Sequence, residues 1–109
     1  MKPLVSNLLA IALLASAAPD KRAFTGVITD SMCDRGDHSR MQMGPTAAEC
    51  TRACVDIHGA EFVLFDGHET YTLSDQKAPE KFAGQKVTVR GTLDPKTKTI
   101  QVDSIAAAK

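Results

Sequence analysis

The chain has 109 residues, which is enough for one small domain. Its formal net charge is zero, and aromatic residues make up only 5% of it. These properties argue against partners that are recognised by charge, such as nucleic acid or an acidic membrane surface. We therefore expect no nucleic-acid binding; the partner would be an unidentified protein or a small ligand.

The first residues have the pattern of a secretory signal peptide. Lys2 gives a positive start, residues 8–14 form a short apolar run, and Ala15-Ser16-Ala17 resembles a cleavage site. The run is too short for a transmembrane span and no cysteine lies near the cut, so no stable membrane anchor is expected. The predicted organisation, with a periplasmic or secreted location, is a signal peptide at 1–17, a polar leader at 18–22 and a domain at 23–107.

Five β-strands are predicted in the mature domain. Asp66-Gly67 indicates a hairpin turn of two or three residues between the second and third strands. Near Ser104 the alternation of the last strand breaks, which predicts a bulge or a strand end. A single helical turn is expected at Pro79. The strands are predicted at 24–29, 62–65, 71–73, 87–93 and 99–103.

One longer helix is predicted inside the connection between the first two strands. Thr46-x-x-Glu49 is a capping box, and Gly59 is a typical left-handed stop. The helix should therefore reach about His58, with Cys50 and Cys54 on the same face.

These elements predict an all-β domain with one helix, built as an OB-like five-stranded Greek-key barrel. We expect one antiparallel sheet. In this fold the loop between the first two strands belongs to the binding face, and here that loop is a cysteine-bearing insertion at 31–60. The expected core consists of Ile28 or Val27, Val87, Val89, Ile100 and Val102.

The insertion contains all three cysteines of the chain, and two interpretations of them stay open. Cys50 and Cys54 are four residues apart on the predicted helix, which is too far for a bond between them. In the first interpretation Cys33 forms a disulfide with Cys50 or Cys54 and so fixes the long loop. In the second, Cys33, His38, Cys50 and Cys54 surround a metal ion as a Cys₃His set.

The metal of the second interpretation would be zinc or copper. A Cys₃His set suits zinc, whereas added thioether ligands from Met41 and Met43 would favour copper(I). His58 and His68 are expected to lie outside the site, the first at a helix end and the second in a solvated turn.

Three aspartates, Asp30, Asp34 and Asp37, precede or follow Cys33 closely. The glycine and glutamate of a calcium-binding loop do not follow them at the required spacing. They are therefore predicted to be solvated turn residues.

The motif Gly-x-Ile-x-Asp-x-x-Cys at residues 26–33, followed by Glu-Cys-x-x-x-Cys-Val at 49–55, continues as Phe-Ala-Gly-Gln-x-Val-x-Val-x-Gly-Thr-Leu at 82–93. This pattern resembles small exported bacterial proteins of uncharacterised function that have an OB-like fold and a Cys…His…Cys-x₃-Cys segment. The resemblance extends from Phe24 to Ile105. It implies a barrel and export, and it brings no established activity.

Signals of catalysis are missing from the sequence. It has no Cys-x-x-Cys pair, no glycine-rich phosphate loop and no serine elbow. We therefore predict a non-enzymatic protein without catalytic residues: an exported binding or structural module whose first long loop is fixed by its cysteines. The alternatives are a zinc- or copper-binding protein and, less well supported by the motifs, a thiol redox protein.

Overall fold

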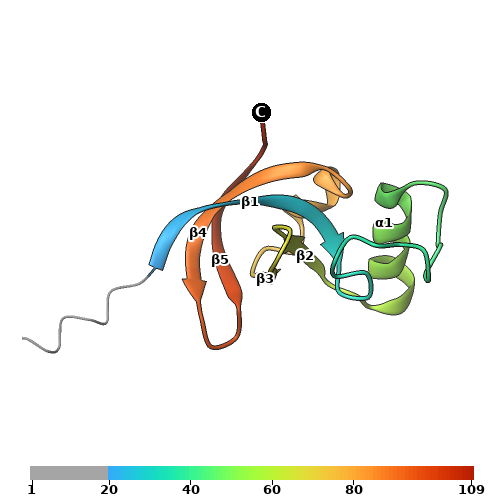
Figure 1. Ribbon diagram of the computed structural model, residues 1–109, viewed down its shortest axis with the longest axis horizontal. Helices are drawn as coiled ribbons and strands as arrows, with labels where there is room; N and C mark the ends of the chain where they lie inside the picture. Colours follow the sequence, from blue (N-terminus) through green and yellow to red (C-terminus); the bar gives the residue numbers. More distant parts are fainter. Residues whose placement is uncertain (1–19) are drawn as a thin grey trace, which may run out of the picture.

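The computed structural model describes residues 20–109, so the predicted signal peptide and residues 18–19 of the leader lie outside the described part. The described chain is mostly β with one α-helix, as predicted (Figure 1). None of its helices is long and apolar enough to cross a membrane. The elements are β1 (Asp20–Asp30), α1 (Ala47–His58), β2 (Phe62–Phe65), β3 (Thr70–Leu73), the 3₁₀ helix η2 (Ala78–Phe82), β4 (Lys86–Asp94) and β5 (Thr99–Ala107).

The strands close into a barrel in the order β1-β2-β3-β5-β4, which confirms the predicted five-stranded barrel. The prediction of a wholly antiparallel sheet is wrong at one pair, because β3 and β5 run parallel. The other pairs are antiparallel. Strand directions can alternate all the way around a closed ring only when the number of strands is even. Five strands therefore require at least one parallel pair.

β1 is longer than predicted and links two sides of the barrel. It begins at Asp20, inside the stretch predicted as a polar leader, because residues 20–27 pair with β4. Its last four residues, from Val27 to Asp30, pair with β2. The strand thus carries the chain across the barrel and ends at Asp30, directly before the cysteine-bearing loop.

One turn differs from the pattern in the sequence, and one predicted irregularity is confirmed. The loop between β2 and β3 has four residues, since Phe65 pairs with Thr70. Asp66 closes this loop by accepting hydrogen bonds from the backbone N–H groups of His68 (2.8 Å) and Glu69 (2.7 Å). The bulge predicted near Ser104 is confirmed: the β4–β5 register shifts between Arg90 and Gly91, and β5 continues beyond it.

The barrel interior is closely packed and agrees well with the predicted core. Ile28 is buried there, whereas Val27 and Val102 are half-buried. Helix α1 lies beside the end of β1 (Figure 1) and packs Ala48 and Val55 against the core. The buried core residues are Phe24, Ile28, Phe62, Leu64, Tyr71, Leu73, Ala83, Val87, Val89 and Ile100.

Candidate metal centre

Cys33 is held in a tight turn at the end of β1. The side chain of Asp30 accepts hydrogen bonds from the backbone N–H groups of Met32 (2.9 Å) and Cys33 (3.0 Å). The hydroxyl of Thr29 donates to the carbonyl of Cys33 at 2.8 Å. Asp30 and Thr29 are fully buried, and Cys33 is only 5% exposed. Buried hydrogen bonds of this kind restrict the backbone, so the position of Cys33 at the end of β1 is well defined.

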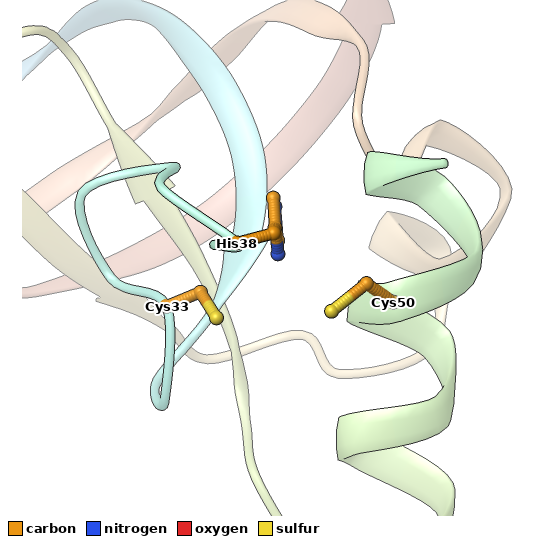
Figure 2. A group of neighbouring side chains, drawn as sticks. All are labelled: Cys33, His38 and Cys50. Carbon is orange, nitrogen blue, oxygen red and sulfur yellow. The ribbon is translucent and has the colours of Figure 1, made fainter. Parts of the chain in front are cut away.

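His38 follows in the same loop and is half-buried. Its ring lies above the space between Cys33 and Cys50 and turns a nitrogen toward it (Figure 2). The Nδ1 atom is buried and has no hydrogen-bond partner among the described residues. A buried ring nitrogen without a partner carries a desolvation cost, which a bound metal ion would remove.

Cys50 is supplied by α1. Thr46 caps this helix by accepting a hydrogen bond from the backbone N–H of Glu49 at 3.1 Å, as the capping box predicts. Cys50 and Cys54 both point inward, with 1% and 0% exposure. The predicted position and orientation of the helix are therefore confirmed.

The loop before the helix touches the Cys50 sulfur through its main chain. The Cys50 thiol donates to the carbonyl of Met41, and the backbone N–H of Met43 donates to Cys50 Sγ at 3.4 Å. An N–H donor directed at sulfur stabilises a thiolate and is a common feature around metal-bound cysteines. These contacts involve backbone groups; the predicted thioether ligation by Met41 and Met43 stays a prediction.

The ligand atoms of Cys33, His38 and Cys50 all lie within 4.8 Å of one another. Figure 2 shows the two sulfurs directed toward each other from the loop and from α1. A tetrahedral zinc ion holds its sulfur and nitrogen ligands about 3.5–3.8 Å apart. The three ligand atoms would therefore reach zinc-binding distances if they moved about 1 Å closer to one another. This Cys-His-Cys cluster is close enough to bind a metal ion, and its donors are those that zinc and copper take.

The predicted disulfide between Cys33 and Cys50 or Cys54 is not formed. All three thiols are free and buried. The Cys50 thiol donates to the Met41 carbonyl, and Cys54 is 4.3 Å from Cys50, far beyond the length of a sulfur–sulfur bond. The long loop is instead fixed by the hydrogen bonds around Asp30 and Cys50.

Cys54 lies next to the cluster without belonging to its innermost group. It is 4.3 Å from Cys50, one helical turn away, and is fully buried. Together with Cys33, His38 and Cys50 it would complete the predicted Cys₃His set. The structure thus brings three of the four predicted ligands within 4.8 Å and places the fourth beside them.

Burial and nearby negative charge keep two of the thiols protonated. Burial, followed by the charges of Asp30, Cys50 and Cys54, raises the pKa of the Cys33 thiol to about 12. Burial and then the Asp30 charge raise the pKa of the Cys54 thiol to about 11. A metal ion that binds here must therefore displace thiol protons.

The prediction that Asp30 is a solvated turn residue is wrong. The residue is 0% exposed, and its Oδ2 atom has no hydrogen-bond partner among the described residues. Asp34 and Asp37 are exposed, as predicted. The motif Gly-x-Ile-x-Asp-x-x-Cys could have indicated this burial, because its aspartate ends a β-prone run three residues before a cysteine.

The remaining histidines are exposed, in agreement with the prediction that His58 and His68 are not ligands. An open cavity of about 380 Å³ lies next to His38. It is lined by His38, Ser39, Gln42 and residues 44–47, which lead into α1. His38 thus belongs both to this open cavity and to the cluster with the buried sulfurs.

One family profile matches the second half of the chain. Residues 58–108 match the profile of the DUF5818 family, described as a protein of unknown function. The match begins at the last residue of α1, so it covers β2 to β5 and leaves out the cysteine-bearing loop. No curated protein and no solved structure matches the chain significantly.

Proposed function

We propose that this protein is a small exported metal-binding module, without enzymatic activity, that holds a zinc or copper ion in its first long loop. Cys33, His38 and Cys50 form the inner set of ligands, and Cys54 completes it. The observation that carries the proposal is the convergence of these three donors within 4.8 Å, together with the unpartnered Nδ1 atom of His38.

The protonation of the thiols supports binding over catalysis. A nucleophilic or redox cysteine needs a thiolate at neutral pH and access to its substrate. Cys33 and Cys54 are buried, and their pKa values are raised to about 12 and about 11. Buried thiols of this kind are inert toward substrates but still bind a metal that displaces their protons.

The test begins with native mass spectrometry of the mature protein after reconstitution with Zn²⁺ or, without oxygen, with Cu⁺. We expect one ion per chain and no loss of two hydrogens, which would mark a disulfide. Competition with a chromophoric chelator then gives the affinity. A chain that binds neither ion, or that carries a disulfide in place of the ion, would contradict the proposal.

Variants of single histidines make the assignment specific. His38→Ala removes a proposed ligand, while His68→Ala removes an exposed histidine outside the cluster. We expect Zn²⁺ to raise the melting temperature of the wild type and of His68→Ala, because binding energy adds to folding energy. His38→Ala should lose most of this increase. Equal behaviour of the two variants would remove His38 from the site.

A further inference from the structure

The Asp30 carboxylate lies directly behind the candidate ligands. It is 0% exposed, and its Oδ1 atom is used by two backbone N–H groups, those of Met32 and Cys33. Its Oδ2 atom is buried without a hydrogen-bond partner among the described residues. The carboxylate is near enough to Cys33 and Cys54 to act on both thiols.

The Cys54 thiol beside this carboxylate is a weak donor, so it offsets little of the cost of removing water from a buried carboxylate oxygen. The hydrogen bonds that hold the Cys33 turn use only Oδ1, and an asparagine would provide an equivalent oxygen. The turn alone therefore does not require an aspartate at this position. A cation bound to the neighbouring sulfurs does require one, because an amide cannot supply a negative charge.

We propose that Asp30 makes the site selective for a divalent ion such as Zn²⁺ over the monovalent Cu⁺. This inference rests on the proposed function. The energy between two charges is proportional to their product, so the carboxylate attracts a dication twice as strongly as a monocation at the same place. Carboxylate oxygen is also a harder donor than thiolate, which favours Zn²⁺ over Cu⁺ if Oδ2 reaches the ion itself.

The experiment compares the affinities of both ions in the mature chain and in Asp30→Asn. This substitution removes the charge and keeps an acceptor oxygen for the two N–H groups. Zn²⁺ is measured against a chromophoric chelator, and Cu⁺ against bathocuproine disulfonate without oxygen. Asp75→Asn is the matched control, because Asp75 makes the same two bonds, to the backbone N–H groups of Lys77 (2.9 Å) and Ala78 (3.0 Å), outside the cluster.

For Asp30→Asn we expect Zn²⁺ affinity to fall about 100-fold and Cu⁺ affinity about tenfold. The lost binding free energy is then twice as large for the dication as for the monocation. Asp75→Asn should leave both affinities unchanged. Equal losses for the two ions would mean that Asp30 only holds the turn, and unchanged affinities would remove it from the site; either result overturns the inference. If the wild type binds neither ion, the proposed function itself fails.

A second measurement guards against a variant that does not fold. In the wild type, ¹³C NMR of the Asp30 carboxyl reports the ion directly. We expect a larger change in its chemical shift with Zn²⁺ than with Cu⁺. A carboxyl resonance that Zn²⁺ leaves unmoved would overturn the inference, whatever the variants do.

Discussion

Gly84 lies against Ala48, so that the turn before β4 and the first turn of α1 are in close contact. A Cβ atom added to Gly84 would stand 2.9 Å from the Ala48 nitrogen and 3.1 Å from its Cα. The backbone N–H of Gly84 also donates to the carbonyl of Ile28 in β1 at 2.8 Å. This contact sets the distance between the barrel and the helix that carries Cys50.

Gly84→Ala should therefore destabilise the protein more than a positive φ alone explains. Gly59 is the matched control, because its φ of 71° is close to the 77° of Gly84, and nothing lies within 4 Å of an added Cβ. We expect Gly59→Ala to cost about 1 kcal/mol of unfolding free energy and Gly84→Ala about 2–4 kcal/mol, measured by urea denaturation. Equal costs would show that an added Cβ at Gly84 makes no steric clash with Ala48.

The cap of α1 provides the second prediction. The hydroxyl of Thr46 accepts the hydrogen bond of the Glu49 N–H, and Thr46 itself is exposed. Thr46→Ala should lower the unfolding free energy by about 1 kcal/mol, whereas Thr46→Ser keeps the acceptor and should stay within a few tenths. Urea denaturation measures both. A serine variant as unstable as the alanine variant would mean that the methyl group, and not the hydroxyl, matters.

The third prediction concerns the stability of the metal-free protein in alkali. The pKa of Cys33 is raised from 9.0 to about 12 in the folded chain, mainly by burial and then by Asp30. Between these values the unfolded chain loses the proton first, so the unfolding free energy falls as the pH rises above about 9. Below pH 9 the Cys33 thiol is protonated in both states, so it adds no pH dependence to the unfolding free energy.

Cys33→Ser tests this dependence, because serine does not titrate in the range. We expect the unfolding free energy of the wild type to fall more steeply between pH 9 and 11 than that of the variant, in denaturant titrations with chelator present. Cys54, whose pKa is raised to about 11, is present in both proteins, so the difference of the two slopes isolates Cys33. Identical slopes would mean that the thiol is not buried as described.

Much of the fold follows from short stretches of sequence. The β-prone run of β1, the alternation in β4 and the cap-to-stop pattern of α1 depend on interactions within a few residues. α1 and β4 are found where they were predicted, with small changes at their ends, whereas β1 begins four residues earlier than predicted. The same holds for Cys50 and Cys54, whose shared helix face follows from their spacing of four.

Contacts between distant residues decided the rest. The parallel pair of β3 and β5 follows from closing a ring of five strands, which no local pattern encodes. The two interpretations of the cysteines could not be separated by spacing, because both need Cys33 near α1. The choice depends on where each thiol and His38 point, and this is set by packing against the barrel.

The sequence alone thus determined the elements, the barrel and the set of donor residues, because hydrophobic periodicity, caps and residue chemistry are local properties. Only the tertiary structure decided that the thiols are free, that His38 reaches Cys33 and Cys50, and that Asp30 is buried behind them. Burial and convergence arise when β1, its loop and α1 pack together. The charge and donor environment of a site is a property of that packing.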